Sequence, residues 1–280
     1  MPLKISLTLP GKVAFITGAG GGLGRAFALK LAHDGWTIGI SDIQEKNLLE
    51  TAQLIHSSGG KAISFVFDIT DKASYEQIAE QFIQQTGRID LLINNAGVGD
   101  GGLFGEYSLD NWEWITKINQ MAVIYGTHFF LPYMKKQNRG HIINIASMAG
   151  VACMPNMSMY NVTKAAVIAL SESLFAEVKP FGVDISVVLP TFFRSNIMQF
   201  NRGDKESTTT GQVIIQRAQH TPDDIADVVL KEAGDNHFYI LFPTLAKIGF
   251  LFKNIFPTLF LKYKLKNYRK KLIRKGIIQA

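Results

Sequence analysis

Short apolar runs alternate with amphipathic segments along most of the chain. Seven runs are apolar enough to form buried strands, and they cover residues 13–16, 36–41, 61–67, 89–93, 141–146, 183–189 and 238–242. Helical periodicity is found at residues 25–33, 71–86 and 109–136, and again from residue 165. Strands that alternate with helices at this spacing form a parallel sheet covered on both faces. We therefore predict a doubly wound α/β fold.

A glycine-rich stretch joins the first predicted strand to the first predicted helix. Residues 17–24 have the sequence T-G-A-G-G-G-L-G. A strand, a glycine turn and a helix N-terminus together favour phosphate, because glycine lets the backbone approach the pyrophosphate and the helix amides attract the anion. A flexible turn is the simpler alternative, but the position between strand and helix favours a dinucleotide site.

The second predicted strand ends at Asp42, which follows Gly24 by 18 residues. This is close to the spacing of a carboxylate that binds the adenosine ribose hydroxyls. Such a carboxylate repels a 2′-phosphate, so we predict NAD as the cofactor and disfavour NADP. The alternative is that Asp42 caps a helix that starts near residue 44.

The candidate chemistry lies at Ser147, Tyr160 and Lys164. Ser147 follows the predicted strand 141–146, and the next helix begins near Tyr160. Tyr160 and Lys164 are four residues apart and share a helix face. A phenol has a pKa of about 10, and a nearby ammonium would lower it toward the range that suits a general acid/base. Such a pair also occurs by chance, so its weight depends on the rest of the chain.

Composition narrows the class of protein. With 280 residues, 47% of them hydrophobic, the chain can form a full core. Its single cysteine, Cys153, excludes an internal disulfide and fits a reducing compartment, so we expect a cytoplasmic protein. Residues 1–10 lack a long apolar region, and we expect neither a secretory signal nor a metal site.

Positive charge is concentrated at the end of the chain. Residues 244–280 hold ten of the 29 Lys/Arg and none of the 23 Asp/Glu, together with many apolar residues. Lys247, Lys253 and Pro257 interrupt the apolar part, so we expect no spanning helix. We divide the chain into a domain at 1–243 and an amphipathic basic tail at 244–280.

An anionic membrane surface would suit the tail. The alternatives are packing on a neighbouring subunit and closure over the active site. Nucleic-acid binding is disfavoured, because no recognition fold accompanies the basic run.

Taken together, the motifs resemble those of the short-chain dehydrogenase/reductase family over residues 11–243. The matching positions are T-G-x-x-x-G-x-G at 17–24, Asp68, N-N-A-G at 94–97, Asn119, Ser147 and Y-x-x-x-K at 160–164. The resemblance implies a single Rossmann domain and an NAD(H)-dependent oxidoreductase that interconverts an alcohol and a carbonyl. It also implies a homodimer or homotetramer, with the helices that contain Asn119 and Tyr160 at the interface.

The resemblance also implies a role for each motif residue. Tyr160 would be the general acid/base, and Lys164 would lower its pKa and bind the nicotinamide ribose. Ser147 would orient the substrate oxygen, and Asn119 would anchor a water chain from Lys164. The implied cofactor-binding residues are Gly18, Gly22, Leu23, Gly24, Asp42, Asp68, Ile69, Asn95, Ala96, Gly97, Tyr160, Lys164, Pro190 and Ser195.

One position departs from the family pattern. The family usually has Pro-Gly after the sixth strand, whereas this chain has Pro190-Thr191. We expect Thr191 to alter the local backbone, while Ser195 takes the place of the hydroxyl residue that usually touches the cofactor.

In the family that the chain resembles, the segment corresponding to residues 191–219 usually covers the substrate. It carries five large apolar residues, and four methionines lie near the catalytic pair: Phe192, Phe193, Ile197, Met198 and Phe200, and Met148, Met154, Met157 and Met159. Because methionine adapts to irregular apolar ligands, we predict an apolar substrate such as a fatty alcohol, a sterol or a retinoid-like molecule. The alternative is that these side chains pack against a helix or a partner subunit.

Two other functions remain compatible with the sequence. An epimerase or dehydratase can use the same fold and Tyr/Lys pair, although such relatives usually run longer and have a differently spaced glycine turn. A catalytically silent nucleotide-sensing or lipid-binding protein is the second alternative. The complete set of Asn119, Ser147, Tyr160 and Lys164 argues against it.

Overall fold

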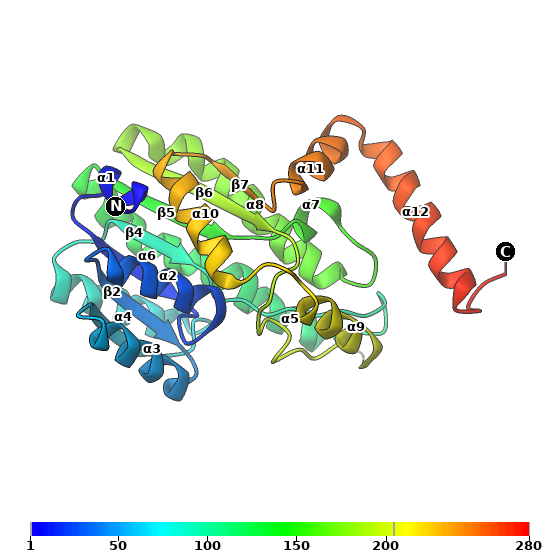
Figure 1. The fold of residues 1–280 in the computed structure, drawn as a ribbon, viewed down its shortest axis with the longest axis horizontal. Helices are drawn as coiled ribbons and strands as arrows, with labels where there is room; N and C mark the ends of the chain where they lie inside the picture. Colours follow the sequence, from blue (N-terminus) through cyan, green and yellow to red (C-terminus); the bar gives the residue numbers. More distant parts are fainter. Residues whose placement is uncertain (1, 204, 280) are drawn as a thin grey trace.

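The computed structural model describes residues 2–203 and 205–279 and contains one seven-stranded parallel sheet (Figure 1). The strands are β1 (Val13–Thr17), β2 (Thr37–Asp42), β3 (Lys61–Val66), β4 (Leu91–Asn94), β5 (Gly140–Ile145), β6 (Val183–Pro190) and β7 (Tyr239–Phe242). Every neighbouring pair is parallel, and the order across the sheet is β3-β2-β1-β4-β5-β6-β7. The predicted doubly wound α/β fold is confirmed.

The strand order reverses between β1 and β4. From β1 the chain first builds outward through β2 and β3, and then returns to place β4 on the other side of β1. In open α/β sheets, ligands bind beyond the carboxyl ends of the strands at such a reversal. The topology therefore places the ends of β1 and β4, at Thr17 and Asn94, beside the expected binding site.

Helices cover both faces of the sheet. The first face packs against α1 (Lys4–Thr8), α2 (Gly22–His33), α3 (Glu45–Ser57) and α10 (Pro222–Gly234), and the second against α4 (Lys72–Thr86), α6 (Ala122–Gln137) and α8 (Ser158–Val178). Successive residues of β1 serve opposite faces: Ala14 and Ile16 belong to the first core, and Phe15 belongs to the second. The Phe15 ring contacts Phe82 edge-to-face and Phe130 at a tilt, with ring-centroid distances of 5.1 and 4.8 Å.

The helix predicted at 109–136 is interrupted. It consists of α5 (Leu109–Thr116), a π-helix η1 (Lys117–Met121) and α6. A π-helix inserts one extra residue into a helical turn, and periodicity over 28 residues does not reveal that insertion. The correction matters because Asn119 lies in η1.

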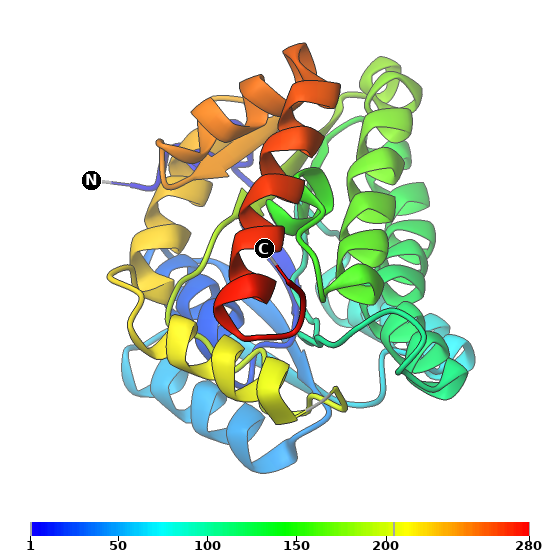
Figure 2. The same cartoon turned by 90° about the vertical axis from the view of Figure 1, so that its right-hand side faces the viewer.

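Two helices lie at the edge formed by the carboxyl ends of the strands: α7 (Ala149–Ala152), and α9 (Lys205–Gln216) in the segment that was expected to cover the substrate. The 3₁₀ turn η2 (Lys179–Phe181) lies at the opposite edge, directly before β6. The tail forms two helices, α11 (Ala246–Ile255) and α12 (Pro257–Arg274). Figure 2 shows α12 crossing the side of the molecule to which the strands point. The division at residue 243 stays a prediction.

Candidate active site

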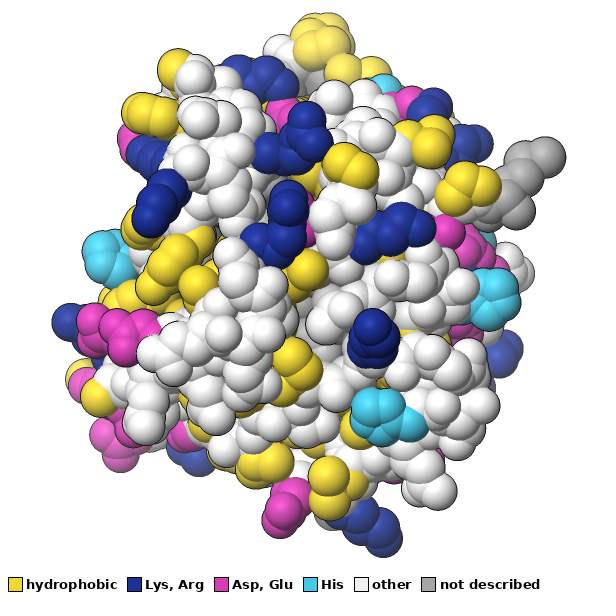
Figure 3. All heavy atoms as spheres, turned by 90° about the vertical axis from the view of Figure 1, so that its left-hand side faces the viewer, with side chains coloured by type: hydrophobic (Ala, Val, Ile, Leu, Met, Phe, Trp, Pro, Cys, Tyr) yellow, Lys and Arg dark blue, Asp and Glu magenta, His cyan; other side chains and the backbone are white. Residues whose placement is uncertain are grey.

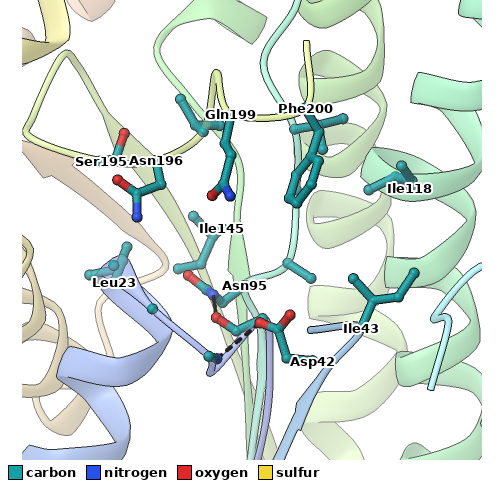
Figure 4. A pocket seen from close by; sticks show the side chains of 18 of the residues that line it. Leu23, Asp42, Ile43, Asn95, Ile118, Ile145, Ser195, Asn196, Gln199 and Phe200 are labelled. Atoms are coloured by element: carbon teal, nitrogen blue, oxygen red, sulfur yellow. Dashed lines mark hydrogen bonds between the residues drawn. The ribbon is translucent and has the colours of Figure 1, made fainter. Parts of the chain in front are cut away.

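A cavity of about 440 Å³ opens at the carboxyl ends of β1, β2, β4 and β5. Every expected cofactor-binding residue except Gly24 lines it, whereas Asn119 and Ser147 do not. Figure 4 shows Asp42 and Asn95 on one side of this cavity, with Ser195, Asn196, Gln199 and Phe200 across from them. The cavity thus lies where the strand order reverses.

The glycine turn packs closely against the start of α2. Gly18 has a φ of +66°, in the left-handed region that favours glycine. A Cβ on Gly24 would lie 2.2 Å from the carbonyl oxygen of Gly18, so no larger residue fits there. Gly21 is the N-cap of α2 and has no side chain to occupy the first helix amides. The turn therefore fits the pyrophosphate of a dinucleotide, with Gly24 as a packing residue beneath it.

Asp42 connects the glycine turn to the end of β2. Its Oδ2 accepts a hydrogen bond from the amide of Gly20 at 2.9 Å, and its Oδ1 accepts one from the amide of Gln44 at 2.9 Å. Asp42 thus orders the turn before α3 but does not cap the helix, as the alternative to ribose binding expected, because the N-cap of α3 is Gln44. Each carboxylate oxygen has a second lone pair, so the same side chain can still accept from ribose hydroxyls.

Thr17 fixes the loop after β4. Its hydroxyl accepts hydrogen bonds from the amides of Asn95 at 3.0 Å and Ala96 at 3.1 Å. The Asn95 side chain in turn donates to the carbonyl oxygens of Thr17 and Gly18 at 2.9 and 3.2 Å. No role for Thr17 was predicted from the sequence, although Thr17 is the first residue of the glycine motif. The contacts make it the residue that holds two walls of the cavity together.

Asn119 is fully buried and bonded to backbone. Its Oδ1 accepts from the amide of Val98 at 2.8 Å, and its Nδ2 donates to the carbonyl of Val98 at 2.9 Å and to Oγ1 of Thr163 at 3.3 Å. A Cβ on Gly97 would lie 3.1 Å from Asn119 Oδ1 and 3.4 Å from Lys164 Nζ. Glycine therefore leaves open the space on which these two polar atoms converge.

Tyr160 and Lys164 project from α8 into the cavity and are almost completely buried. Lys164 Nζ donates to the carbonyl of Ile145 at 2.9 Å and lies 5.8 Å from the Tyr160 ring centroid. Burial raises the pKa of Tyr160 to about 12, although hydrogen bonding with Ser147 opposes that rise. Burial also lowers the pKa of Lys164 to about 8. Burial and the Ser147 hydrogen bond account for the pKa of Tyr160, so the structure shows no lowering of that pKa by Lys164.

Ser147 stands between the end of β5 and the start of α7. Its Oγ accepts from the amide of Ala149 at 3.1 Å and donates to the carbonyl of Pro190 at 3.4 Å. Thr191 does not adopt a positive φ, and its amide donates to the carbonyl of Phe242 at 2.9 Å. Thr191 therefore needs no glycine-like backbone, and the expected effect of Thr191 on the local backbone stays a prediction.

The apolar residues expected around the substrate separate into two groups. Phe193, Ile197 and Phe200 line the cavity, whereas Phe192 is half-exposed and the Met198 sulfur packs beside Gly99.

None of the four methionines lines the cavity. Met157 and Met159 pack with Tyr160 in a small cluster, Met148 packs against the core beneath β6, and Met154 is half-exposed. Met148, Met157 and Met159 therefore pack within the protein, in agreement with the packing alternative, whereas Met154 is not shown to do so.

Several lining residues escaped our sequence reasoning. They are Gln44, Asn47, Val98, Trp114, Ile118, Asn196, Gln199 and Arg202 among others. Arg202 lies over the Trp114 ring at 4.4 Å from its centroid, and the Asn111 side chain donates to the Arg202 carbonyl at 3.1 Å. The one sequence feature that indicated a place for Arg202 at the cavity was its position within the 191–219 segment.

Comparison with known proteins agrees with this arrangement. The model of the short chain dehydrogenase family matches residues 12–206. The 3-oxoacyl-[acyl-carrier-protein] reductase FabG of Thermotoga maritima is 30% identical over 234 residues, which are 84% of this chain and 95% of that protein.

Two solved structures extend the comparison. A short-chain dehydrogenase/reductase from Burkholderia phymatum in complex with NAD superposes with a TM-score of 0.85 and 30% identity over 90% of this chain and 96% of that one. A metagenomic short-chain oxidoreductase in complex with NADP superposes with a TM-score of 0.69 and 30% identity, over 82% of this chain and 96% of that one.

Proposed function

Because the chain belongs to the short-chain dehydrogenase family of oxidoreductases, we propose that it uses NAD(H) to interconvert an alcohol and a carbonyl on an apolar substrate. The observation that carries the proposal is the joint lining of one cavity by Asp42, Tyr160 and Lys164. Asp42 would bind the adenosine ribose, and Tyr160 and Lys164 would contact the reacting ends of the cofactor and the substrate.

The cofactor preference depends on the charge at the end of β2. Asp42 places a carboxylate where a 2′-phosphate would approach, which disfavours NADP. Arg25 follows the glycine turn, but its guanidinium is held by Glu50 at 3.0 Å and by the carbonyl of Gly20 at 2.6 Å. It is therefore already engaged within the protein, and we propose NAD as the cofactor.

In the proposed mechanism, the nicotinamide supplies or takes up a hydride when it is bound. At neutral pH Tyr160 is a protonated phenol, because burial raises its pKa to about 12. That form can donate its proton to a carbonyl oxygen during reduction and becomes a phenolate; in oxidation the phenolate would accept the proton of the alcohol. Ser147 would hold the same oxygen. Lys164 would stabilise the phenolate as it forms.

The proposed substrate class follows from the cavity wall. Phe193, Ile197 and Phe200 supply apolar surface opposite the cofactor-binding residues. Fatty, sterol and retinoid-like alcohols present matching apolar bodies. The relative named as a 3-oxoacyl reductase adds 3-oxoacyl thioesters to the compounds to be tested, because an acyl chain is also apolar.

We also propose a homo-oligomer and attachment to the surface of a membrane. Among the described residues no helix has the length and apolar character needed to cross a bilayer. Surface attachment through the tail would bring the enzyme to the phase in which apolar alcohols and carbonyls dissolve.

Cofactor titration followed by turnover tests the proposed function. Quenching of intrinsic fluorescence should saturate at lower NADH than NADPH concentrations. Turnover should increase with apolar size across alcohols, ketones and 3-oxoacyl thioesters. NADH binding without any turnover would favour the nucleotide-sensing alternative. A preference for short polar sugars or hydroxy acids would contradict the apolar substrate.

A further inference from the structure

The outward side of α11 is an apolar row. Leu245, Ile248, Leu251 and Ile255 are each more than half exposed, at three- or four-residue spacing along one side of the helix. Ala246, on the opposite side, is buried, and α11 contacts β7 and α7. Phe256 and Leu259 extend this apolar row into the first turn of α12, and both are more than half exposed.

The outward side of α12 is a basic row. Lys262, Lys266, Arg269 and Lys270 are all exposed and fall on one side of the helix. No acidic residue interrupts them, since residues 244–280 contain none. The two rows adjoin where α11 ends and α12 begins.

The inward side of α12 is anchored to the body of the protein. Lys264 Nζ donates to the carbonyls of Ala152, at 2.6 Å, and Cys153. The Tyr268 hydroxyl donates to Oδ1 of Asn156 at 2.8 Å, and Phe260 is buried. Partial burial lowers the pKa of Lys264. One basic side chain is therefore used inward, and the apolar and basic rows stay outward.

We infer that the outward sides of α11 and α12 dock on an anionic lipid bilayer. The apolar row would enter the boundary between headgroups and acyl chains, and the basic row would lie against lipid phosphates. This inference names the partner for the membrane attachment proposed above and rests on that proposal. It does not depend on the catalytic residues.

Charge favours a bilayer over a second copy of the chain. The tail carries ten positive charges and no negative ones, so two tails placed face to face would repel each other. Figure 3 shows the opposite side of the molecule, where basic, acidic and apolar side chains are intermixed. The tail therefore has the composition of an interfacial segment, and the side of the molecule opposite it does not.

The anchoring contacts also orient the molecule. Asn156 accepts from Tyr268, and its carbonyl accepts from the amide of Gly102 at 2.8 Å. The same loop leads into α8, which carries Tyr160. A bilayer bound to the tail would thus lie on the side to which the strands point (Figures 1 and 2).

Vesicle flotation with the full-length protein tests the inference. The vesicles contain either phosphatidylcholine alone or phosphatidylcholine mixed with phosphatidylglycerol. Wild type should float with the mixed vesicles and much less with the neutral ones. Lys266→Glu with Lys270→Glu should lower the partition coefficient at least about 25-fold, since each basic residue contributes roughly a fivefold factor. Leu251→Glu with Ile255→Glu should lower it on both vesicle types.

Matched controls carry the same changes elsewhere on the surface. Lys72→Glu with Lys136→Glu reverses two exposed lysines, and Leu49→Glu with Leu54→Glu changes two exposed leucines of α3. Both controls should float as wild type does. NADH quenching, measured on every variant, reports whether the fold is intact and whether the proposed cofactor site binds, independently of flotation.

Two results would overturn the inference. One is wild-type protein that fails to float with either vesicle type. The other is tail variants that float as well as their controls. A tail-dependent dimer in light scattering, without flotation, would instead assign the surface to a second copy.

Discussion

The amide of Gly20 donates to Oδ2 of Asp42 at 2.9 Å, and this contact joins the glycine turn to the end of β2. A Cβ on Gly20 would lie 2.8 Å from the same oxygen, so the two residues leave no room for a side chain between them. The parts proposed to bind pyrophosphate and ribose are therefore positioned as one unit.

Asp42→Asn should weaken the preference for NADH. Removing the charge should lower the affinity for NADH and raise the affinity for NADPH relative to it. We expect the ratio of the two affinities to change roughly ten- to a hundredfold, because hydrogen bonds to a charged group contribute about that factor. Fluorescence titration with both nucleotides measures the ratio. Glu45→Gln is the control, because it removes the same charge from an exposed residue at the start of α3. An unchanged ratio in the Asp42 variant would contradict ribose recognition by Asp42.

Tyr160→Phe should remove turnover and keep the cofactor. Loss of the proton donor should lower kcat by roughly 10²- to 10⁴-fold, because a positioned acid or base contributes about that factor. Steady-state kinetics on the best substrate and NADH titration measure the two effects. Tyr263→Phe, at an exposed tyrosine of α12, should leave both unchanged. Full activity in the Tyr160 variant would exclude it as the general acid/base.

Lys164→Met should show the pH dependence of a buried lysine. Burial lowers the pKa of Lys164 to about 8 from 10.5, so between these pH values the unfolded chain binds a proton that the folded protein has lost. The free energy of unfolding of wild type, relative to the variant, should therefore rise as the pH increases from 8 to 10.5. Urea unfolding at several pH values measures it. A difference that falls over this range would contradict the burial of an ionisable lysine.

Gly24→Ala should destabilise the protein by about 1–3 kcal/mol, as overpacking of a close contact typically does. Its Cβ would lie 2.2 Å from the Gly18 carbonyl oxygen. Gly21→Ala is the matched control, because Gly21 has an extended φ of −171° and its nearest neighbour would be 4.0 Å away. Chemical unfolding compares the two variants. Equal losses would show that the turn lacks the tight packing at Gly24.

Much of the fold and of the site could be predicted from sequence. The strands were predictable because buried parallel strands are continuous apolar runs. The position of the cavity was predictable because many of its residues follow those strands directly. Asp42 and Asn95 are examples, since each lies at a strand end whatever the packing of the helices.

Other features of the site depend on the direction in which side chains point, and the sequence pattern does not reveal that direction. Met148 and Met159 were near the catalytic pair in sequence but pack into the interior. Arg202 was unremarkable in sequence but lies over Trp114 at the cavity wall. The pKa of Tyr160 depended on burial rather than on its spacing from Lys164.

The π-helix η1 makes the length of this segment as important as its composition. Removing one residue between Lys117 and Met121 would let the helix become regular without rotating α6 relative to α5, because the wide turn holds one residue more than an α-helical turn. The change would be confined to the turn itself, where Asn119 could no longer face Val98 and Thr163 together. A one-residue deletion here would therefore disturb the site while the core-facing side of α6 stays in place, and chimeras of this protein should exchange the α5–η1–α6 segment as a whole.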